Sequence, residues 1–229
     1  MISDGVAADG SEWITKLIRS WRGDAQGLAE ELTAAALSRR NMEAFYCPTA
    51  IEGVQKVLEL IAPEDVVSWG GAMTADEMNL KELLRRRGQP VIDRDTAATP
   101  AERQELMRKA LTCDTFLMSS NAISEDGQLV NIDGNGNRVA ALCFGPRRVI
   151  VIAGMNKVVG TLDDAIARAR HIAAPANLQR FDVKTPCNTT GCCADCVSPQ
   201  CSCAQIVVTR FSMNPNRIKV VLVGENLGL

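Results

Sequence analysis

Strand-like and helix-like segments alternate along most of this sequence, and this order limits the folds that it can adopt. Short apolar runs at residues 44–47, 66–69, 91–92, 115–118 and 147–153 predict buried strands. Segments with helical spacing of apolar residues separate them, from Asp24 onward and over residues 51–61, 76–87, 101–111 and 162–172. Parallel strands need crossover connections of this length, so the pattern predicts an α/β fold with a mostly parallel sheet covered on both faces.

The last two apolar runs, at residues 205–211 and 218–223, contain alternating polar letters. That alternation predicts a pair of C-terminal edge strands joined as a hairpin. The run at residues 147–153 is almost continuously apolar, which predicts a central strand.

Size and charge narrow the class of protein. A chain of 229 residues with 46% hydrophobic content can bury one α/β core. Its net charge of -2, with no basic block, argues against a nucleic-acid partner. There is no secretory leader pattern and no apolar run long enough to cross a membrane, so we expect a cytoplasmic protein with no membrane partner.

The first 23 residues form a separate segment in this interpretation, ahead of a domain at residues 24–229. Trp13, Leu17, Ile18 and Trp21 follow helical spacing and predict a helical arm. The arm either packs on a second copy of the chain in a homo-oligomer or closes the core of its own domain.

Residues 119–138 directly follow the strand at 115–118 and contain many polar side chains and three glycines. They are either a surface loop or a site at a strand end. The glycines before Arg138 would let backbone amides approach an anion at the start of a helix. An Asn-Gly hairpin turn is the alternative.

Four polar turns follow predicted strands, at residues 69–77, 93–95, 119–138 and 154–157. Ligands of open α/β sheets bind outside the carboxyl ends of the strands, so the coincidence predicts a ligand site there. Each turn, considered alone, is also compatible with an ordinary connection between a strand and a helix.

The sequences GGAMTADE at residues 70–77, SSNAISEDGQLVNIDGNGNRVAAL at 119–142 and FGPRRVIVIAGMNKVV at 144–159, followed by a cysteine loop, resemble the LUD domain of lactate-utilisation proteins. The resemblance covers roughly residues 25–229. It implies the Rossmann-like fold of CoA transferases, ribose-5-phosphate isomerase and glucosamine-phosphate isomerases. It also implies a link to L-lactate oxidation beside iron–sulfur subunits.

The resemblance further implies a site for a small anionic or phosphorylated ligand. Its ligand-binding positions are Gly70, Gly71, Thr74, Asn121, Asp133, Gly134, Gly136, Asn137, Arg138, Asn156 and Lys157. Ala72 replaces the usual hydroxyl residue and removes one phosphate donor. Glu125 or Glu77 would act as base or nucleophile. In the alternative interpretation, Glu125 only stabilises a turn, and whether the chain is an enzyme stays open.

Six cysteines lie within residues 187–203, inside a loop at 185–204. In a reducing cytosol such density favours a bound metal, because thiolates are the ligands of zinc and iron–sulfur clusters. The resemblance singles out Cys187, Cys193, Cys196 and Cys203. Zinc and an iron–sulfur cluster are both compatible with these four. Free thiols, or thiol–disulfide switching that uses the extra pair, are the alternatives.

Two functions follow from these features. In the first, the chain takes part in the oxidation of L-lactate or a related organic acid, with an anion at the strand ends and a metal at the cysteine loop. In the second, it is a non-catalytic redox-sensing or electron-transfer partner of an iron–sulfur oxidoreductase, and the cysteine loop is its working part.

Overall fold

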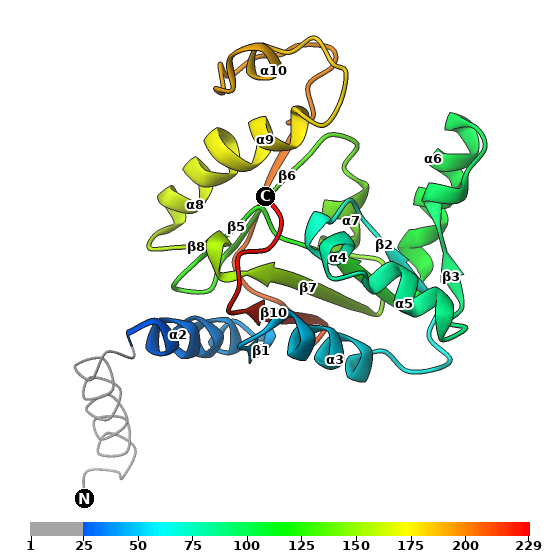
Figure 1. Cartoon of the computed structure of the whole chain (residues 1–229), viewed down its shortest axis with the longest axis vertical. Helices are drawn as coiled ribbons and strands as arrows, with labels where there is room; N and C mark the ends of the chain where they lie inside the picture. The colour runs from blue at the N-terminus through cyan, green and yellow to red at the C-terminus, as the bar shows by residue number, and fades with distance from the viewer. Residues whose placement is uncertain (1–24) are drawn as a thin grey trace, which may run out of the picture.

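The computed structural model describes residues 25–229, and its framework is a six-stranded sheet (Figure 1). The strand order is β1-β10-β7-β4-β2-β3, and neighbouring strands all run parallel. The strands are β1 (Glu43–Cys47), β2 (Val67–Trp69), β3 (Val91–Ile92), β4 (Thr115–Met118), β7 (Arg148–Gly154) and β10 (Ile218–Val223). The predicted α/β fold with a mostly parallel sheet is therefore confirmed.

Helices cover both faces of this sheet. α3 (Ala50–Leu60), α4 (Met73–Glu77) and α5 (Leu80–Arg86) pack on one face. α2 (Ala25–Arg39) and α7 (Asn137–Cys143) pack on the other, and α6 (Pro100–Lys109) lies near β3 at the rim (Figure 1). Because side chains alternate along a strand, Leu117 of β4 faces the first group while Phe116 and Met118 face the second. The predicted helix at 76–87 is divided in two at Asn79, which adopts a left-handed φ of 54°.

A smaller sheet of four strands lies beside the large one, in the order β8-β5-β6-β9. It contains β5 (Ala122–Ser124), β6 (Leu129–Asp133), β8 (Val158–Val159) and β9 (Gln205–Thr209). β5 and β6 form an antiparallel hairpin within the polar central stretch, so that stretch is not a surface loop. Its few apolar residues are enough to bury both faces: Ile123 and Leu129 join the core under α2, and Ala122 and Val130 face the next helical layer.

That outer layer consists of α8 (Leu162–Arg168), a π-helical turn (Ala169–Ala173) and α9 (Ala174–Leu178). Thr161 caps α8 in a reciprocal capping box with Asp164. The cysteine loop follows, with the short helix α10 (Pro186–Thr190), and lies beyond α9 at the end of the molecule (Figure 1).

The predicted C-terminal hairpin is wrong. β9 is an edge strand of the small sheet, but β10 lies inside the large sheet between β1 and β7. The edge interpretation depended on the polar letter at Lys219. In the structure Lys219 stands opposite Glu43 of β1 and forms an ion pair with it, so an interior strand accommodates the charge.

Further findings concern other parts of the chain. The helical arm at residues 1–23 lies outside the described residues. Of the three cysteines outside the loop, Cys47 and Cys113 are buried beside strands, whereas Cys143 is exposed. Within residues 25–229, none of the helices combines the length and apolar character needed to cross a bilayer.

Candidate functional site

Lys157 lies at the centre of a buried polar cluster at the carboxyl ends of the large sheet. Its side chain is only 3% exposed. Its Nζ donates hydrogen bonds to Ser119 Oγ at 2.9 Å and to Thr74 Oγ1 at 3.0 Å, and the two hydroxyl oxygens are 3.3 Å apart. Thr74 and Lys157 were predicted for the site; Ser119 was not named, although it begins the central stretch.

Sheet topology explains why these three residues meet. Thr74 lies in α4 after β2, Ser119 directly follows β4, and Lys157 ends the 3₁₀ turn after β7. β2, β4 and β7 are adjacent parallel strands, so the turns at their carboxyl ends converge. The predicted convergence of polar turns is realised here, with three elements distant in sequence.

Electrostatics at Lys157 disfavour its charged form. Burial, which is the largest cause, and the positive charges of Arg168 and Arg138 together lower the pKa of Lys157 to about 8, while Glu77 opposes the decrease. Within the described residues, Lys157 makes no ion pair with a carboxylate: Glu77 is close enough to act electrostatically but is not in direct contact.

Arg168 is a second buried cation at this site, and the sequence analysis did not select it. Its side chain on α8 is 8% exposed. It hydrogen-bonds to the backbone carbonyls of Asn156, at 3.1 Å, and Asn121. In the described part of the chain it, too, has no carboxylate partner, and burial lowers its pKa. No motif identifies it, because Arg168 reads as one of several basic residues on an amphipathic helix.

The segment after β10 lies directly over Lys157. The amide of Gly228 donates to Glu77 Oε2 at 2.6 Å, and the Leu227 amide donates to Asn156 Oδ1 at 3.1 Å. Asn156 Nδ2 in turn donates to the Gly228 carbonyl at 3.3 Å. A Cβ on Gly228 would lie 3.0 Å from Lys157 Nζ and 2.5 Å from Thr74 Oγ1. The predicted residues Glu77 and Asn156 thus hold this segment against the lysine.

Arg138 is buried beside the cluster, and internal partners use its side-chain donors. Its Nη1 donates to the Ser119 carbonyl at 2.9 Å and to Asn131 Oδ1; its Nη2 donates to the Ile132 carbonyl at 2.7 Å and to Asn121 Oδ1 at 3.1 Å. It therefore fixes the hairpin β5–β6 to the end of β4. Its stem also explains Gly70, where a Cβ would lie 2.9 Å from Arg138 Cδ.

Asp133 occupies the start of α7. Its Oδ2 accepts from the amides of Arg138 at 3.0 Å and Val139 at 3.2 Å, and its Oδ1 accepts from Gly136 at 3.2 Å. The backbone amides at the start of α7, which were predicted to bind an anion, therefore already donate to a carboxylate of the chain. Asp133 and Arg138 read as ligand-binding letters, but in this structure they pair with neighbouring groups.

The remaining predicted glycines lie against Arg94, the cysteine loop and β9. A Cβ on Gly71 would come 3.4 Å from Arg94 Nη2. One on Gly134 would meet Ser202 Cα at 3.1 Å, and Gly136, at φ 80°, faces Gln205 of β9. Asn137 is half-buried as the first residue of α7.

Arg94 lies in the polar turn after β3 that the sequence predicted as part of the site, although it was not named as a ligand-binding residue. Its side chain is 14% exposed, with Asp95 Oδ1 3.8 Å from Nε. Within the described residues, the buried Nε makes no hydrogen bond. Burial lowers the pKa of Arg94.

The two candidate carboxylates are placed differently. Glu77 is close to Lys157 and holds Gly228. Glu125 is exposed in the turn between β5 and β6, where its own amide donates to the Val159 carbonyl at 2.8 Å. The next residue, Asp126, forms an ion pair with Arg40 at the end of α2. The structure therefore brings Glu77, but not Glu125, to the buried cluster.

Five of the six clustered cysteines line one cavity of about 70 Å³ between the loop, α9 and β6. These are the four singled out for metal, Cys187, Cys193, Cys196 and Cys203, together with Cys201. Burial, as the largest cause, and the other four thiols together raise the pKa of Cys203 to about 11. The donor chemistry fits a thiophilic metal. In the described residues, however, no three Cys, His, Asp or Glu side chains converge closely enough to hold an ion.

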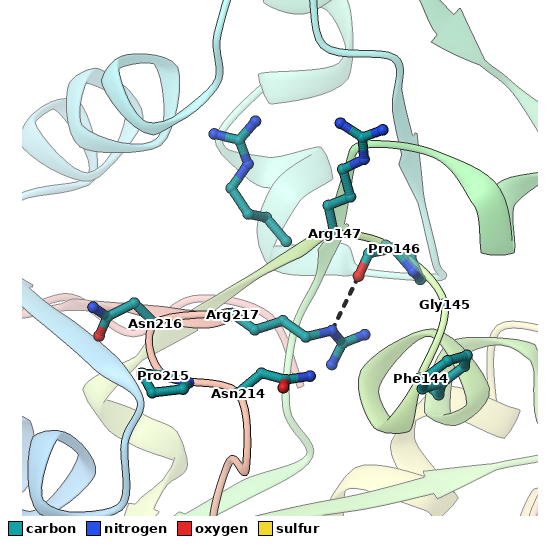
Figure 2. Close-up of a pocket in the computed structure, with 9 residues that line it drawn as sticks. Phe144, Gly145, Pro146, Arg147, Asn214, Pro215, Asn216 and Arg217 are labelled. Carbon is teal, nitrogen blue, oxygen red and sulfur yellow. Dashed lines mark hydrogen bonds between the residues drawn. The ribbon is translucent and has the colours of Figure 1, made fainter.

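A larger cleft of about 450 Å³ lies at the opposite, amino-terminal edge of the sheet, before β7 and β10 (Figure 2). Its arginines are engaged with the chain: Arg217 donates to the Pro146 carbonyl at 3.0 Å and to the last carbonyls of α7. Arg148 pairs with Asp65 at 2.6 Å. None of the predicted ligand residues lines this cleft.

Comparisons with known proteins agree with the fold. The family model of the LUD domain matches residues 30–223. A protein of the DUF162 family from Deinococcus radiodurans is similar in structure, with 12% identity, a TM-score of 0.52, and coverage of 87% of this chain and 98% of that one. No curated protein matches the chain.

Lower similarity is found to two other solved structures. Ribose 5-phosphate isomerase A from Methanocaldococcus jannaschii has 14% identity and a TM-score of 0.33 over 49% of this chain and 55% of that one. The eIF2B delta structure from Chaetomium thermophilum has 17% identity and a TM-score of 0.33 over 52% and 50%.

Proposed function

The chain belongs to the LUD domain family, and from that premise we propose that it takes part in the oxidation of L-lactate or a related organic acid. Its ligand in this proposal is a small anionic or phosphorylated molecule bound at the carboxyl ends of the large sheet. The site consists of Thr74, Ser119 and Lys157, with Glu77 and Asn156 at its cover.

One observation supports the anionic ligand above the others: Lys157 and Arg168 are both buried, and neither has a carboxylate partner among the described residues. Charges removed from water are normally paired, because an isolated buried charge is costly. A ligand anion would provide the missing negative charge and would shift the lysine back towards its protonated form.

Thermal unfolding in the presence of candidate ligands tests this proposal, since binding to the native state raises apparent stability. L-lactate, pyruvate, a CoA ester, a sugar phosphate and a nucleotide should be compared. We expect a saturable increase in Tm with at least one of them, lost in Lys157→Met and kept in Lys109→Met, whose side chain is exposed on α6. Equal stabilisation of both variants would contradict the site.

Within this site we assign the role of base to Glu77 rather than Glu125. Both carboxylates are exposed, but Glu77 acts electrostatically on Lys157, whereas Glu125 lies in the hairpin turn and is not among the charges that act on the lysine. Once a substrate is identified, Glu77→Gln should reduce kcat by a factor on the order of 10² or more. Glu125→Gln should leave kcat within about twofold, and the reverse result would move the base to the hairpin.

A second function is supported by the cysteine cavity. We propose that Cys187, Cys193, Cys196 and Cys203 hold zinc or an iron–sulfur cluster, because all four thiols line the same cavity. An iron–sulfur cluster would make the chain an electron-transfer partner of other iron–sulfur subunits. In either case the four cysteines would bind the metal as thiolates. The four sulfur atoms would have to move closer together to do so.

Metal analysis with an absorption spectrum, on protein purified without oxygen, tests this second function. We expect metal that is lost in Cys196→Ser and kept in Cys192→Ser, because Cys192 is exposed and does not line the cavity. Iron with sulfide would favour the electron-transfer role, and zinc a structural one. Protein that contains neither metal would contradict the proposal.

A further inference from the structure

We propose that Lys157 forms an imine with a small 2-oxo acid, an anionic ligand whose carbonyl group is adjacent to its carboxylate. This inference rests on the proposed function, because it names the ligand class and the covalent step of the same site. The supporting observation is a buried primary amine held by two hydroxyl groups, beside the buried Arg168, which has no carboxylate partner among the described residues.

Lys157 differs from the other lysines in the described part of the chain. Lys56, Lys81 and Lys219 pair with carboxylates, which stabilise the charged ammonium. Lys109 and Lys184 are exposed to water, which does the same. Lys157 is buried, and its hydrogen bonds go to neutral hydroxyls. A lysine becomes a nucleophile when it is desolvated or lies next to another cation, and Lys157 meets both conditions.

The charges around Nζ indicate what it would attack. Arg168 and Arg138 both act on Lys157 as positive charges, and Glu77 is the negative charge among its neighbours. Arg138 has four internal acceptors, so its Nη donors are in use. Arg168 donates only to backbone carbonyls, and its charge is not neutralised. A ligand with a carboxylate beside its reactive carbon would place that carboxylate towards Arg168.

The two hydroxyls suit the proton transfers of imine formation. The neutral amine attacks the carbonyl carbon, a C–N bond forms, and the carbonyl electron pair moves to oxygen. A proton passes from nitrogen to that oxygen, for which Ser119 and Thr74, at 2.9 and 3.0 Å from Nζ, provide a relay. The second nitrogen proton leaves with the hydroxyl group as water, and the C=N bond forms. Amine and carbonyl compound thus give imine and water, with no oxidant or reductant.

Space for the ligand comes from the covering segment. The Gly228 backbone lies against Nζ, and Glu77 and Asn156 hold it through hydrogen bonds. A carbonyl compound reaches Nζ when Leu227 and Gly228 move aside. That movement frees Glu77 to exchange protons with the bound ligand.

Reductive trapping on the full chain tests the proposal. The protein is incubated with pyruvate and sodium cyanoborohydride at pH 8, digested, and mapped by mass spectrometry. We expect one reduced pyruvate adduct per chain, on the peptide that contains Lys157, and none on Lys109 or Lys184. L-lactate should give no adduct, because it has no carbonyl group. Ser119→Ala, which removes one relay hydroxyl, should slow trapping by a factor on the order of 10².

Adducts confined to exposed lysines, or an unmodified Lys157, would overturn the imine. Two measurements separate this failure from that of the proposed function. Pyruvate that raises the Tm of the protein but leaves no adduct overturns the imine and leaves the anion site in place. Pyruvate, L-lactate and the phosphorylated ligands that neither stabilise nor modify the protein overturn both.

Discussion

Lys157 makes the stability of the ligand-free protein depend on pH in an unusual direction. Burial lowers its pKa from 10.5 in the unfolded chain to about 8 in the folded one. The unfolded state therefore binds more protons between these values, and the free energy of unfolding should rise as pH increases from about 8 to 10.5. The predicted contribution is roughly 3 kcal/mol, at 1.36 kcal/mol per pKa unit.

Urea unfolding of the wild type and Lys157→Met at pH 7 and pH 10 measures this effect. The wild type should gain stability relative to the variant as pH rises. The groups that face Nζ are Arg168, Arg138 and Glu77 besides the two hydroxyls, and Lys157→Met keeps them all. The difference in stability between the wild type and Lys109→Met should not change between the two pH values, because both proteins keep Lys157. A wild-type advantage that does not change with pH would show that Lys157 is not perturbed.

Arg138 is expected to contribute to the stability of the fold rather than to ligand binding. Replacing it by Met removes the arginine donors of Asn131 Oδ1, Asn121 Oδ1 and two backbone carbonyls, although Asn121 Oδ1 keeps the Ile132 amide as a donor. The expected loss is about 3 kcal/mol or more in the free energy of unfolding. Arg86→Met is the matched control: that side chain is 72% exposed and pairs with Glu82 one turn away, so it should cost under about 0.5 kcal/mol. If thermal melts show similar small losses of stability for both variants, Arg138 is not needed for stability, and its predicted role in ligand binding would be favoured.

The sequence located the polar cluster but did not assign its individual side chains. Thr74 and Lys157 are positions that the family resemblance implies, and each lies in a polar turn that follows a predicted strand. Ser119 and Arg168 were missed, since a serine in a polar stretch and an arginine on a helix carry no pattern of their own. The sequence around Asp133 and Arg138 is the same whether these side chains bind a ligand or bond to neighbouring groups of the chain. Only the fold shows that Asp133 faces the start of α7.

At the scale of elements, the segment after β10 is held by its close fit to β7. A Cβ on Gly154 would lie 2.5 Å from the Glu225 carbonyl and 2.6 Å from the Leu227 amide. Gly154→Ala should therefore displace this segment and expose Lys157. We expect faster hydrogen exchange at residues 225–229 and a lower free energy of unfolding by about 1–3 kcal/mol.

Gly160→Ala is the control for this change, because a Cβ there meets only Asp164 Oδ2, at an ordinary 3.5 Å. Both variants add one methyl group near the same end of the fold. Unchanged exchange at residues 225–229 in Gly154→Ala would mean that the segment tolerates the added atom. The site would then have to admit its ligand by another route.

Element types were predictable from the sequence where local pattern and tertiary context agreed. The helices after β1 and before β4 were predicted at residues 51–61 and 101–111, and the structure has them with small boundary shifts, capped by Thr49 and Thr99. The hairpin β5–β6 was hidden because its buried letters are few and separated by polar ones. The position of β10 was also not predictable, since strand order depends on pairings far apart in sequence.

For the whole molecule, the order of strands predicts where the fold is most stable. β7 and β10 are interior, and their apolar side chains are fully buried. Their amides should exchange only through global unfolding, whereas the edge strands β3 and β9 should also exchange by local opening. Native-state hydrogen exchange at increasing denaturant tests this order. Equal protection of β9 and β10 would contradict it.

The place of β10 also has a consequence for synthesis on the ribosome. Lys219 of β10 pairs with Glu43 of β1, 176 residues earlier. Until β10 has emerged, β1 has no neighbour in the sheet and β7 has an open edge. The nascent chain therefore cannot close its main sheet before β10 has been synthesised, and until then two strand edges are free to pair with other chains. Such a protein should depend on chaperones that bind exposed strands until β10 has emerged.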